Sequence, residues 1–338
     1  MGGGGGNEAK TEVELESREW YMAAYAAEGV PTSDHLKLRT VKLSVAADSI
    51  PDGHVALELL FVSVDPYLRT RMSGSRDPVQ FELNHVISAF GIGRVIRSKD
   101  SKYEEGDIVV HPNCPIAEYC VTSSLMLRKF DPNSGISLPD YISSMGVPGF
   151  AAWVGIEVLG DPKPGSNVFV SAASGAVGMY AGQLAKLRGC RVIGSTGSDD
   201  KIKLMKEEFG YDDGFNYHKE TDYDAALSRY FPNGIDVYLD NVGGRMLEAV
   251  LNHVNKYARI PLCGMISQYN KVWTEREGVR NLLNMVGKEV RMEGFMLASY
   301  SHRFVEFAEV MEIESFLESL ASLFTSSNVG KVVVQVKP

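Results

Sequence analysis

The stretch Val168-Phe-Val-Ser-Ala-Ala-Ser-Gly-Ala-Val-Gly178 decides the fold of this 338-residue chain. It begins as a short apolar, β-prone run, breaks into small residues and continues as a helix. Ala173, Gly175 and Gly178 stand at the three glycine positions of a G-x-G-x-x-G fingerprint, with alanine at the first. Small residues there let the backbone approach a pyrophosphate and let the helix pack closely on the strand. The anion would then lie on the free N–H groups of a helix N-terminus.

The residues that follow this stretch supply the context that the glycine pattern needs. From Ala176 to Arg188 apolar residues recur at helical spacing, and Gly189 ends the predicted helix. Cys190 to Gly194 then reads as a second strand. A glycine pattern alone could mark an ordinary strand–turn–helix joint. The strand–helix–strand order favours a dinucleotide-binding unit instead.

The end of the second predicted strand indicates which dinucleotide binds. An NAD site usually has an acidic residue there, bonded to the ribose 2′-hydroxyl. Here the segment Gly194-Ser-Thr-Gly-Ser198 has no acid, and Lys201 follows it. A missing carboxylate and an added cation favour a 2′-phosphate, hence NADP(H). The alternative is that Lys201 is a solvated lysine that pairs with Asp199 or Asp200.

The chain divides into a β-rich first half and a second half in which helices and strands alternate. Six strands with helices between them predict an α/β fold with a doubly wound parallel sheet. The last strand, Lys331 to Val336, is expected to return to the first half, and Pro261 predicts an edge or a bulge in its strand. The expected strands are 20–30, 37–45, 54–64, 87–98, 107–111 and 117–122 in the first half, and 168–171, 191–195, 213–216, 235–240, 258–263 and 290–294 in the second.

Composition narrows the function classes. A hydrophobic content of 44% allows an ordinary globular core, and a net charge of −9 argues against a nucleic-acid or anionic membrane surface. No apolar run is expected to approach the length of a membrane span, no signal-peptide pattern is present, and the N-terminal glycines are read as a flexible tail. Four scattered cysteines predict a reducing compartment, the cytoplasm. Cys114 and Cys120, with His111 nearby, lack the second ligand pair of a structural zinc site, so no metal is expected.

These motifs together resemble the zinc-independent medium-chain dehydrogenase/reductases, and within them the NADPH-dependent alkenal double-bond reductases of plants and the mammalian prostaglandin reductases. The motifs that carry the resemblance span nearly the whole chain in one order. They are Val64-Asp-Pro-Tyr-Leu-Arg69, Ala172-Ala-Ser-Gly-Ala-Val-Gly178, Gly197-Ser-Asp-Asp-Lys201, Phe215-Asn-Tyr217, Asp240-Asn-Val-Gly-Gly244, Cys263-Gly-Met-Ile-Ser-Gln-Tyr-Asn270, Gly294-Phe-Met-Leu297 and Asn328-Val-Gly-Lys331.

The resemblance implies a domain division and a set of site residues. Residues 1–142 and 312–338 would form a GroES-like catalytic domain, and residues 143–311 a Rossmann domain, in a homodimer. Tyr269 would be catalytic as the donor to the enolate oxygen, with a cofactor ribose hydroxyl as the other candidate. Tyr67, Phe90 and Tyr269 would face the substrate, although core packing is the alternative for these aromatic residues. The NADPH contacts would be Pro66, Gly175, Ala176, Val177, Gly178, Gly197, Lys201, Tyr217, Asn241, Cys263, Tyr269, Phe295, Met296, Leu297 and Asn328.

The chain also differs from the family pattern. The catalytic cysteine, the Gly-His-Glu motif and the four-cysteine lobe of zinc-dependent relatives are absent, and Phe90 replaces a tyrosine common in plant members. The segment from Phe304 to Phe324 looks shorter than usual. The implied reaction is reduction of the carbon–carbon double bond of an enal or enone. A quinone reductase of the same superfamily and a non-catalytic NADPH-binding protein remain as alternatives.

Overall fold

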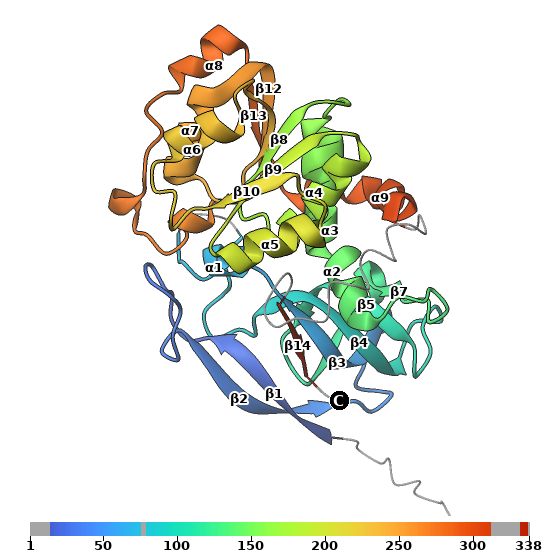
Figure 1. Ribbon diagram of the computed structural model, residues 1–338. Helices are drawn as coiled ribbons and strands as arrows, with labels where there is room; N and C mark the ends of the chain where they lie inside the picture. The colour runs from blue at the N-terminus through green and yellow to red at the C-terminus, as the bar shows by residue number, and fades with distance from the viewer. Residues whose placement is uncertain (1–13, 76–78, 312–331, 337–338) are drawn as a thin grey trace, which may run out of the picture.

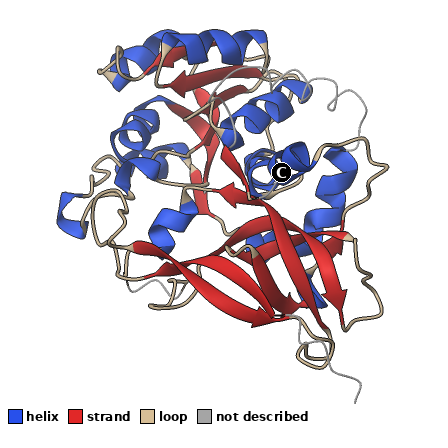
Figure 2. Cartoon of the chain, turned by 90° about the horizontal axis from the view of Figure 1, so that it is seen from below, coloured by secondary structure: helices blue, strands red, loops and turns tan. Residues whose placement is uncertain are grey.

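The computed structural model describes residues 14–75, 79–311 and 332–336. The strands form two large sheets and one two-stranded ribbon. The parallel sheet and most of the helices make up one half of the molecule, and the antiparallel sheet makes up the other (Figure 1). Seen from below, the antiparallel strands form a continuous layer (Figure 2). The predicted α/β fold with a separate β-rich part is confirmed.

The antiparallel half is built around two long neighbouring strands. Its main sheet has the order β14-β3-β4-β5-β7, and β6 pairs with the other part of β3. Val332 of β14 lies opposite Val64 of β3, so the last strand returns to the first half as predicted. The elements are β1 (Glu14–Met22), β2 (Leu36–Ser44), β3 (His54–Val64), α1 (Tyr67–Arg71), β4 (Ser88–Ser98), β5 (Ile108–Pro115), β6 (Tyr119–Ser123), β7 (Arg128–Lys129) and β14 (Val332–Gln335).

The parallel half has six strands in the order β10-β9-β8-β11-β12-β13. Helices α3, α4, α5 and α9 pack on one face of this sheet, and α6, α7 and α8 pack on the other. The strands are β8 (Asn167–Val170), β9 (Arg191–Thr196), β10 (Asp213–Asn216), β11 (Ile235–Leu239), β12 (Val254–Leu262) and β13 (Arg291–Gly294). The helices are α2 (Leu138–Ser144), α3 (Val147–Trp153), α4 (Ala176–Leu187), α5 (Asp199–Glu207), α6 (Tyr223–Tyr230), α7 (Gly244–His253), α8 (Leu283–Lys288) and α9 (Phe304–Met311), with a π-helical turn Val154–Gly160 and 3₁₀ turns Ile266–Gln268, Trp273–Glu275 and Leu297–Arg303.

The joint between β8 and α4 shows why the fingerprint needs small residues. A Cβ atom on Gly178 would lie 2.4 Å from the Ala172 carbonyl oxygen and 2.6 Å from the Ala173 Cα atom. Both are backbone atoms, so no side-chain rotation could relieve the clash. Gly178 therefore allows the first turn of α4 to lie against the end of β8. Gly189, with φ of +74°, ends the helix region in a left-handed conformation, as the sequence predicted.

Two local predictions were wrong. The first strand runs over Glu14–Met22, and residues 23–35 form a loop because Gly29 and Pro31 interrupt extended pairing.

Pro261 lies neither at an edge nor at a bulge, since β12 pairs with β11 and β13. Its carbonyl accepts the Asp240 N–H at 3.0 Å, near the end of the strand. The irregular register lies earlier, where Tyr257 has φ of +65°.

One helical stretch in the described part of the chain, Leu138–Gly160, is long and apolar enough to cross a membrane by length and composition. The expectation that no segment approaches this length was therefore wrong. The structure buries 83% of its most apolar window among other elements. Trp153, for example, is 2% exposed and packs against Phe150 and Phe307. The apolar composition is explained by a core helix that joins the two halves.

Candidate active site

The predicted cofactor residues follow the carboxyl ends of successive parallel strands. Gly175 follows β8, Gly197 follows β9 and Tyr217 follows β10. Asn241, Cys263 and Phe295 follow β11, β12 and β13 in the same way, and Met296 and Leu297 come next. Because parallel strands end at one edge of a sheet, all these residues lie along the same edge. Ligands of open α/β sheets bind at this edge.

The turn after β8 can accept a phosphate group. Gly175 caps the N-terminus of α4, and Gly175, Ala176 and Val177 are only partly buried, so the start of the helix is partly exposed. Ala172 adopts a left-handed conformation with φ of +51°, which turns the chain sharply after the strand. A Cβ atom on Gly175 would lie 3.1 Å from the Ala172 carbonyl oxygen. The open helix start fits a pyrophosphate.

The end of β9 presents cationic and phenolic groups. Ser198 caps α5 by accepting the Lys201 N–H at 3.3 Å, which places Lys201 in the first turn. The Tyr217 hydroxyl would lie 2.8 Å from a Cβ atom on Gly197, so this tyrosine lies directly over the strand end. Asp199 forms an ion pair with Lys219 and accepts from Asn216 at 2.9 Å. Within the described residues Lys201 has no ion-pair partner, so its ammonium is available to a 2′-phosphate.

A buried carboxyl group shapes the turn after β11. Asp240 is fully buried, and its Oδ1 accepts from the Tyr238 hydroxyl at 2.7 Å and from the Val242 and Gly243 N–H groups at 2.9 and 2.8 Å. Its Oδ2 has no partner among the described residues. Burial raises the pKa of Asp240 despite these bonds. The Asn241 amide donates to the Ser171 carbonyl at 2.8 Å, which holds this turn against the end of β8.

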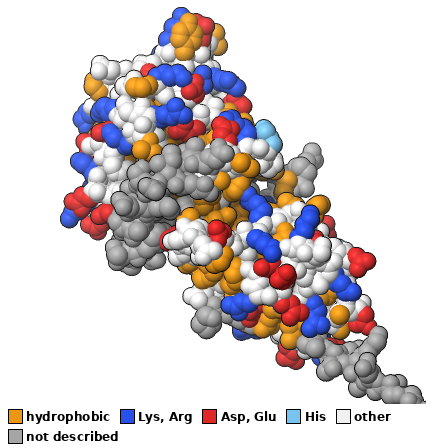
Figure 3. Space-filling view, turned by 90° about the vertical axis from the view of Figure 1, so that its right-hand side faces the viewer, with side chains coloured by type: hydrophobic (Ala, Val, Ile, Leu, Met, Phe, Trp, Pro, Cys, Tyr) orange, Lys and Arg blue, Asp and Glu red, His pale blue; other side chains and the backbone are white. Residues whose placement is uncertain are grey.

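A cavity of about 880 Å³ opens where the two halves meet beside β12 and β13. Hydrophobic side chains also gather at the surface between the halves (Figure 3). Cys263, Tyr269, Phe295 and Met296 are predicted residues that line the cavity. Burial, followed by the nearby Asp240, raises the pKa of the Cys263 thiol to about 12, so this sulfur stays protonated and serves as a neutral wall. The other described lining residues are Thr70, Ser73, Ser75, Leu262, Gly264, Met265, Gln268, Trp273, Arg276, Glu277, Gly294, Ser299 and Tyr300.

Two tyrosines, Tyr269 and Tyr300, line this cavity, and Tyr269 is the one that the sequence predicted as a site residue. The phenol oxygen of Tyr269 accepts a hydrogen bond from the Met265 N–H at 3.0 Å, which fixes the ring within its own loop. Burial is the main reason that the pKa of Tyr269 is raised, so the phenol keeps its proton at neutral pH. The phenol can donate this proton in a hydrogen bond to a group in the cavity.

Of the substrate residues predicted from the antiparallel half, Phe90 is buried and Tyr67 is partly buried. Tyr67 begins α1, and burial raises the pKa of its phenol to about 12. Phe90 is 4% exposed and packs with Ile92, Val110 and Ile142. Neither is among the described residues that line the cavity, and for Phe90 the structure favours core packing. Pro66 is exposed at the N-terminus of α1, and the predicted residue Asn328 and the segment 312–331 lie outside the described residues.

Sequence reasoning missed several residues that line the cavity. Thr70, Trp273, Arg276 and Tyr300 lie in segments without a recognisable motif, except that Thr70 directly follows Val64-Asp-Pro-Tyr-Leu-Arg69. Their positions depend on how the two halves meet, and no local pattern encodes that. Extending each motif by three residues would have reached Thr70, Trp273 and Tyr300, but not Arg276.

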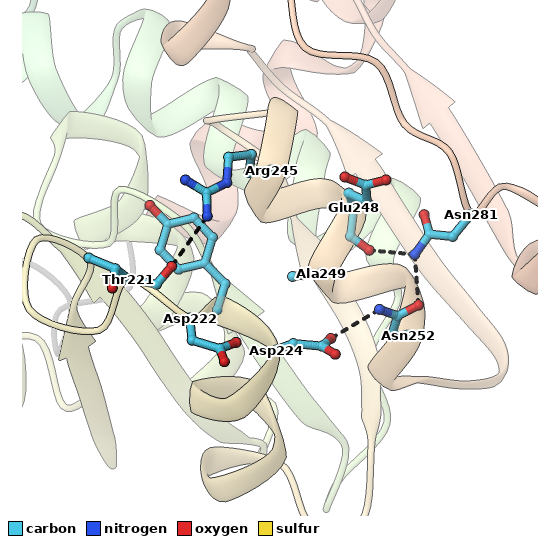
Figure 4. Close-up of a pocket in the computed structure, with 9 residues that line it drawn as sticks. Thr221, Asp222, Asp224, Arg245, Glu248, Ala249, Asn252 and Asn281 are labelled. Atoms are coloured by element: carbon cyan, nitrogen blue, oxygen red, sulfur yellow. Dashed lines mark hydrogen bonds between the residues drawn. The ribbon is translucent and has the colours of Figure 1, made fainter.

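A second cavity of about 520 Å³ lies between α6 and α7, away from the predicted residues (Figure 4). Its polar side chains bond one another: Asn252 donates to Asp224 at 3.0 Å, and Asn281 donates to Asn252 at 2.7 Å. None of the predicted site residues is among its described lining. The chemistry is therefore expected at the cavity between the halves.

Comparison with known proteins agrees with this geometry. A family model described as the N-terminal domain of oxidoreductase matches residues 18–129, and one described as zinc-binding dehydrogenase matches residues 176–313. The chain is 38% identical to a 2-alkenal reductase (NADP(+)-dependent) of Nicotiana tabacum, over 96% of this chain and 98% of that protein. This chain belongs to the medium-chain dehydrogenase/reductase family, in its zinc-independent alkenal reductase branch. The resemblance that the motifs indicated is thereby confirmed.

Two further relatives of this medium-chain reductase support the assignment. The (+)-pulegone reductase of Mentha piperita is 39% identical over 89% of this chain and 93% of its own length. Among solved structures, CurA of Vibrio vulnificus in complex with NADPH has a TM-score of 0.83 and 31% identity, covering 95% of this chain and 99% of that one. Within the described residues of this chain, no group of three or more His, Cys, Asp or Glu side chains could hold a metal ion.

Proposed function

We propose that this protein reduces the carbon–carbon double bond of α,β-unsaturated aldehydes and ketones with NADPH. The observation that carries the proposal is that the glycine turn, Lys201 and the Tyr269 cavity open along one edge of the parallel sheet. The relatives add the reaction class, since the tobacco protein is named for NADP(+)-dependent alkenal reduction and the peppermint protein for pulegone reduction.

The residues along this edge fit NADPH. Gly175 and the accessible start of α4 would hold the pyrophosphate, and Lys201 and Tyr217 would hold the 2′-phosphate end. Asn241, Cys263 and Phe295 would lie beside the nicotinamide and its ribose. The bound cofactor supplies a hydride to the β-carbon of the substrate.

The side chains around the cavity would stabilise charge on the substrate. As the β-carbon is reduced, negative charge develops on the carbonyl oxygen, which becomes an enolate. The Tyr269 phenol, protonated and fixed by the Met265 N–H, is the donor that we assign to this oxygen. Water then protonates the α-carbon. Phe295, Met296 and Tyr300 give the cavity an apolar lining suited to the carbon chain of an enal or enone.

We also propose the residue boundaries of the two domains and a homodimer. Residues 1–142 and 312–338 would form the catalytic domain, and residues 143–311 the Rossmann domain. Among the described strands β13 pairs only with β12, so its other edge is open, and exposed Leu283 and Val286 of α8 lie in the segment before it. A second copy of this chain would cover this edge. Size-exclusion chromatography with light scattering should give twice the chain mass, and L283D/V286D should give one chain mass.

We infer the cellular compartment from the state of the cysteine thiols. All four cysteines are free, as in proteins of a reducing compartment, and we place this enzyme in the cytoplasm. Fractionation of cells that express the tagged chain should recover it with soluble cytosolic markers, and recovery with membranes would contradict this.

A single panel assay tests the function. NADPH oxidation is followed with a simple enal, an enone, a quinone and an allylic alcohol at equal concentrations. Turnover of the enal and the enone with a saturated carbonyl product is expected. Turnover of the quinone alone would favour the quinone reductase alternative. NADPH binding without turnover of any substrate would instead identify a binding protein.

A further inference from the structure

One arginine ties the two halves of the molecule together beside the cavity. Arg69 of α1 donates from Nε to Asn270 Oδ1 at 2.8 Å and from Nη2 to the Gly29 carbonyl at 2.9 Å. The Gly29 N–H donates to the Asn270 carbonyl at 2.8 Å. Arg69 and Gly29 belong to the antiparallel half, and Asn270 follows β12 in the parallel half. Three segments far apart in sequence therefore meet at one guanidinium.

This junction adjoins the residue to which we assign enolate stabilisation. Asn270 directly follows Tyr269, whose phenol is fixed by the Met265 N–H in the same loop. Thr70, the neighbour of Arg69, lines the cavity that Tyr269 also lines. A displacement of Asn270 would move Tyr269, because the two residues share a peptide bond.

Arginine is suited to this position because its planar fork can bond two acceptors in fixed directions. Burial, and then the charge of Arg276, lowers the pKa of Arg69, but a guanidinium stays charged at neutral pH. Its Nη1 is buried without a partner in the described residues, so the orientation of the guanidinium depends on the bonds from Nε and Nη2. A lysine could keep the charge but could not make both contacts in this geometry.

We propose that Arg69 is a positioning residue for the reductase reaction, acting through Asn270 to hold the loop 263–270 and the Tyr269 phenol at the cavity. This proposal rests on the proposed function for the role of Tyr269. Arg71 is the matched control, since it lies on the same helix and bonds within the antiparallel half, to the Val79 carbonyl at 3.2 Å and over the Phe81 ring.

Hydrogen–deuterium exchange of the cofactor-free protein tests the Arg69–Asn270 contact without any activity measurement. Peptides that cover residues 264–271 report on the Met265 amide that bonds Tyr269. In Arg69→Ala and Asn270→Ala the exchange of these peptides should be at least about tenfold faster, while Arg71→Ala keeps the wild-type rate. Wild-type exchange in Arg69→Ala would overturn the proposal. Arg69→Lys, which keeps the charge, provides a second reading should the alanine variant fold poorly, and it should also exchange faster than wild type.

Enone turnover then tests whether the Arg69–Asn270 contact acts through Tyr269. Arg69→Ala should lower kcat about tenfold, with the KM for NADPH unchanged within about twofold, because a misplaced donor slows the chemical step. In a Tyr269→Phe background the same change should lower kcat no further. A full additional tenfold loss in the double variant would overturn the assignment of Arg69 to Tyr269. Failure of the wild-type protein to reduce any enone would instead overturn the proposed function. The exchange result would still show whether Arg69 holds the loop 263–270.

Discussion

The phenol oxygen of Tyr269 lies 3.0 Å from the backbone nitrogen of Met265, four residues earlier in the same loop. The Met265 N–H donates this bond, so the hydroxyl hydrogen of Tyr269 remains free to donate elsewhere. The loop thus orients the phenol and leaves its donor capacity for the cavity.

We expect Tyr269→Phe to lower kcat on enals with little change in NADPH affinity. Loss of one donor to a developing oxyanion typically costs about 3 kcal/mol, or about 100-fold in rate. Phenylalanine keeps the ring, so folding should be unaffected. Steady-state kinetics with an enal, together with NADPH titration by fluorescence, checks this. Full kcat and full kcat/KM in the variant would show that Tyr269 is only a wall of the pocket.

Lys201→Ala should raise the KM for NADPH about tenfold and leave the KM for NADH nearly unchanged. Only NADPH has the 2′-phosphate, and an ammonium in contact with it contributes a charge-assisted hydrogen bond of about 1.5 to 3 kcal/mol. Lys203→Ala is the matched control, because Lys203 lies on the same helix and pairs with Glu207. An equal effect of Lys201→Ala on both cofactors would refute its assignment to the phosphate.

Alanine substitutions at Gly178 and Gly175 of the fingerprint should have different effects, the first on stability and the second on cofactor binding. Gly178→Ala forces backbone contacts of 2.4 and 2.6 Å, so we expect a loss of about 1 to 3 kcal/mol in the free energy of unfolding. Gly175→Ala has one contact at 3.1 Å and an ordinary φ of −80°, so stability should change little. Its methyl group should instead weaken NADPH binding at the helix start. Urea unfolding and NADPH titration of both variants distinguish these effects, and identical behaviour would contradict the division.

Asp240 should make the protein less stable as the pH rises. Burial raises the pKa of this carboxyl group in the folded state above its unfolded value of 3.8. Between these two pKa values the folded state binds more protons than the unfolded state, so the free energy of unfolding falls with increasing pH in this window. Above the raised pKa the loss is complete. In Asp240→Asn this contribution is absent, so urea midpoints measured from pH 4 upward should decline less steeply than in wild type. Parallel pH profiles would rule out a raised pKa.

Activity should survive exhaustive dialysis against a chelator. His111 Nε2 bonds Thr122 Oγ1 at 2.9 Å, and burial lowers the pKa of His111 to about 4, so it packs as a neutral residue beside Cys114 and Cys120. A tetrahedral zinc site needs four ligands at about 2.0 to 2.3 Å from the metal. Metal analysis should find no stoichiometric zinc. Loss of activity on dialysis that zinc restores would count decisively against this prediction.

The parallel half and its carboxyl-end edge could be predicted from local sequence signals. Gly178 is needed for the close packing of α4 on β8, which is a local interaction. The order of strands and helices follows from the periodicity of apolar residues. Both signals lie in neighbouring residues, so β8, α4 and β9 could be predicted. Lys201 could likewise be placed at a helix start, because Ser198 is a local cap. Chain order alone puts Gly175, Tyr217 and Asn241 at one edge, since parallel strands end together.

The surroundings of the cavity depend on how the two halves pack against each other. Pro261 was predicted at an edge or a bulge, but strand order depends on the packing of helices on the two faces of the sheet. Phe90 was predicted either to face a substrate or to pack in the core, and its contact with Ile142 across the fold depends on the tertiary structure. The tie between Arg69 and Asn270 joins residues 201 positions apart, and no periodic or local signal encodes such a contact. Local interactions fix the elements, whereas the cavity depends on long-range contacts between the two halves.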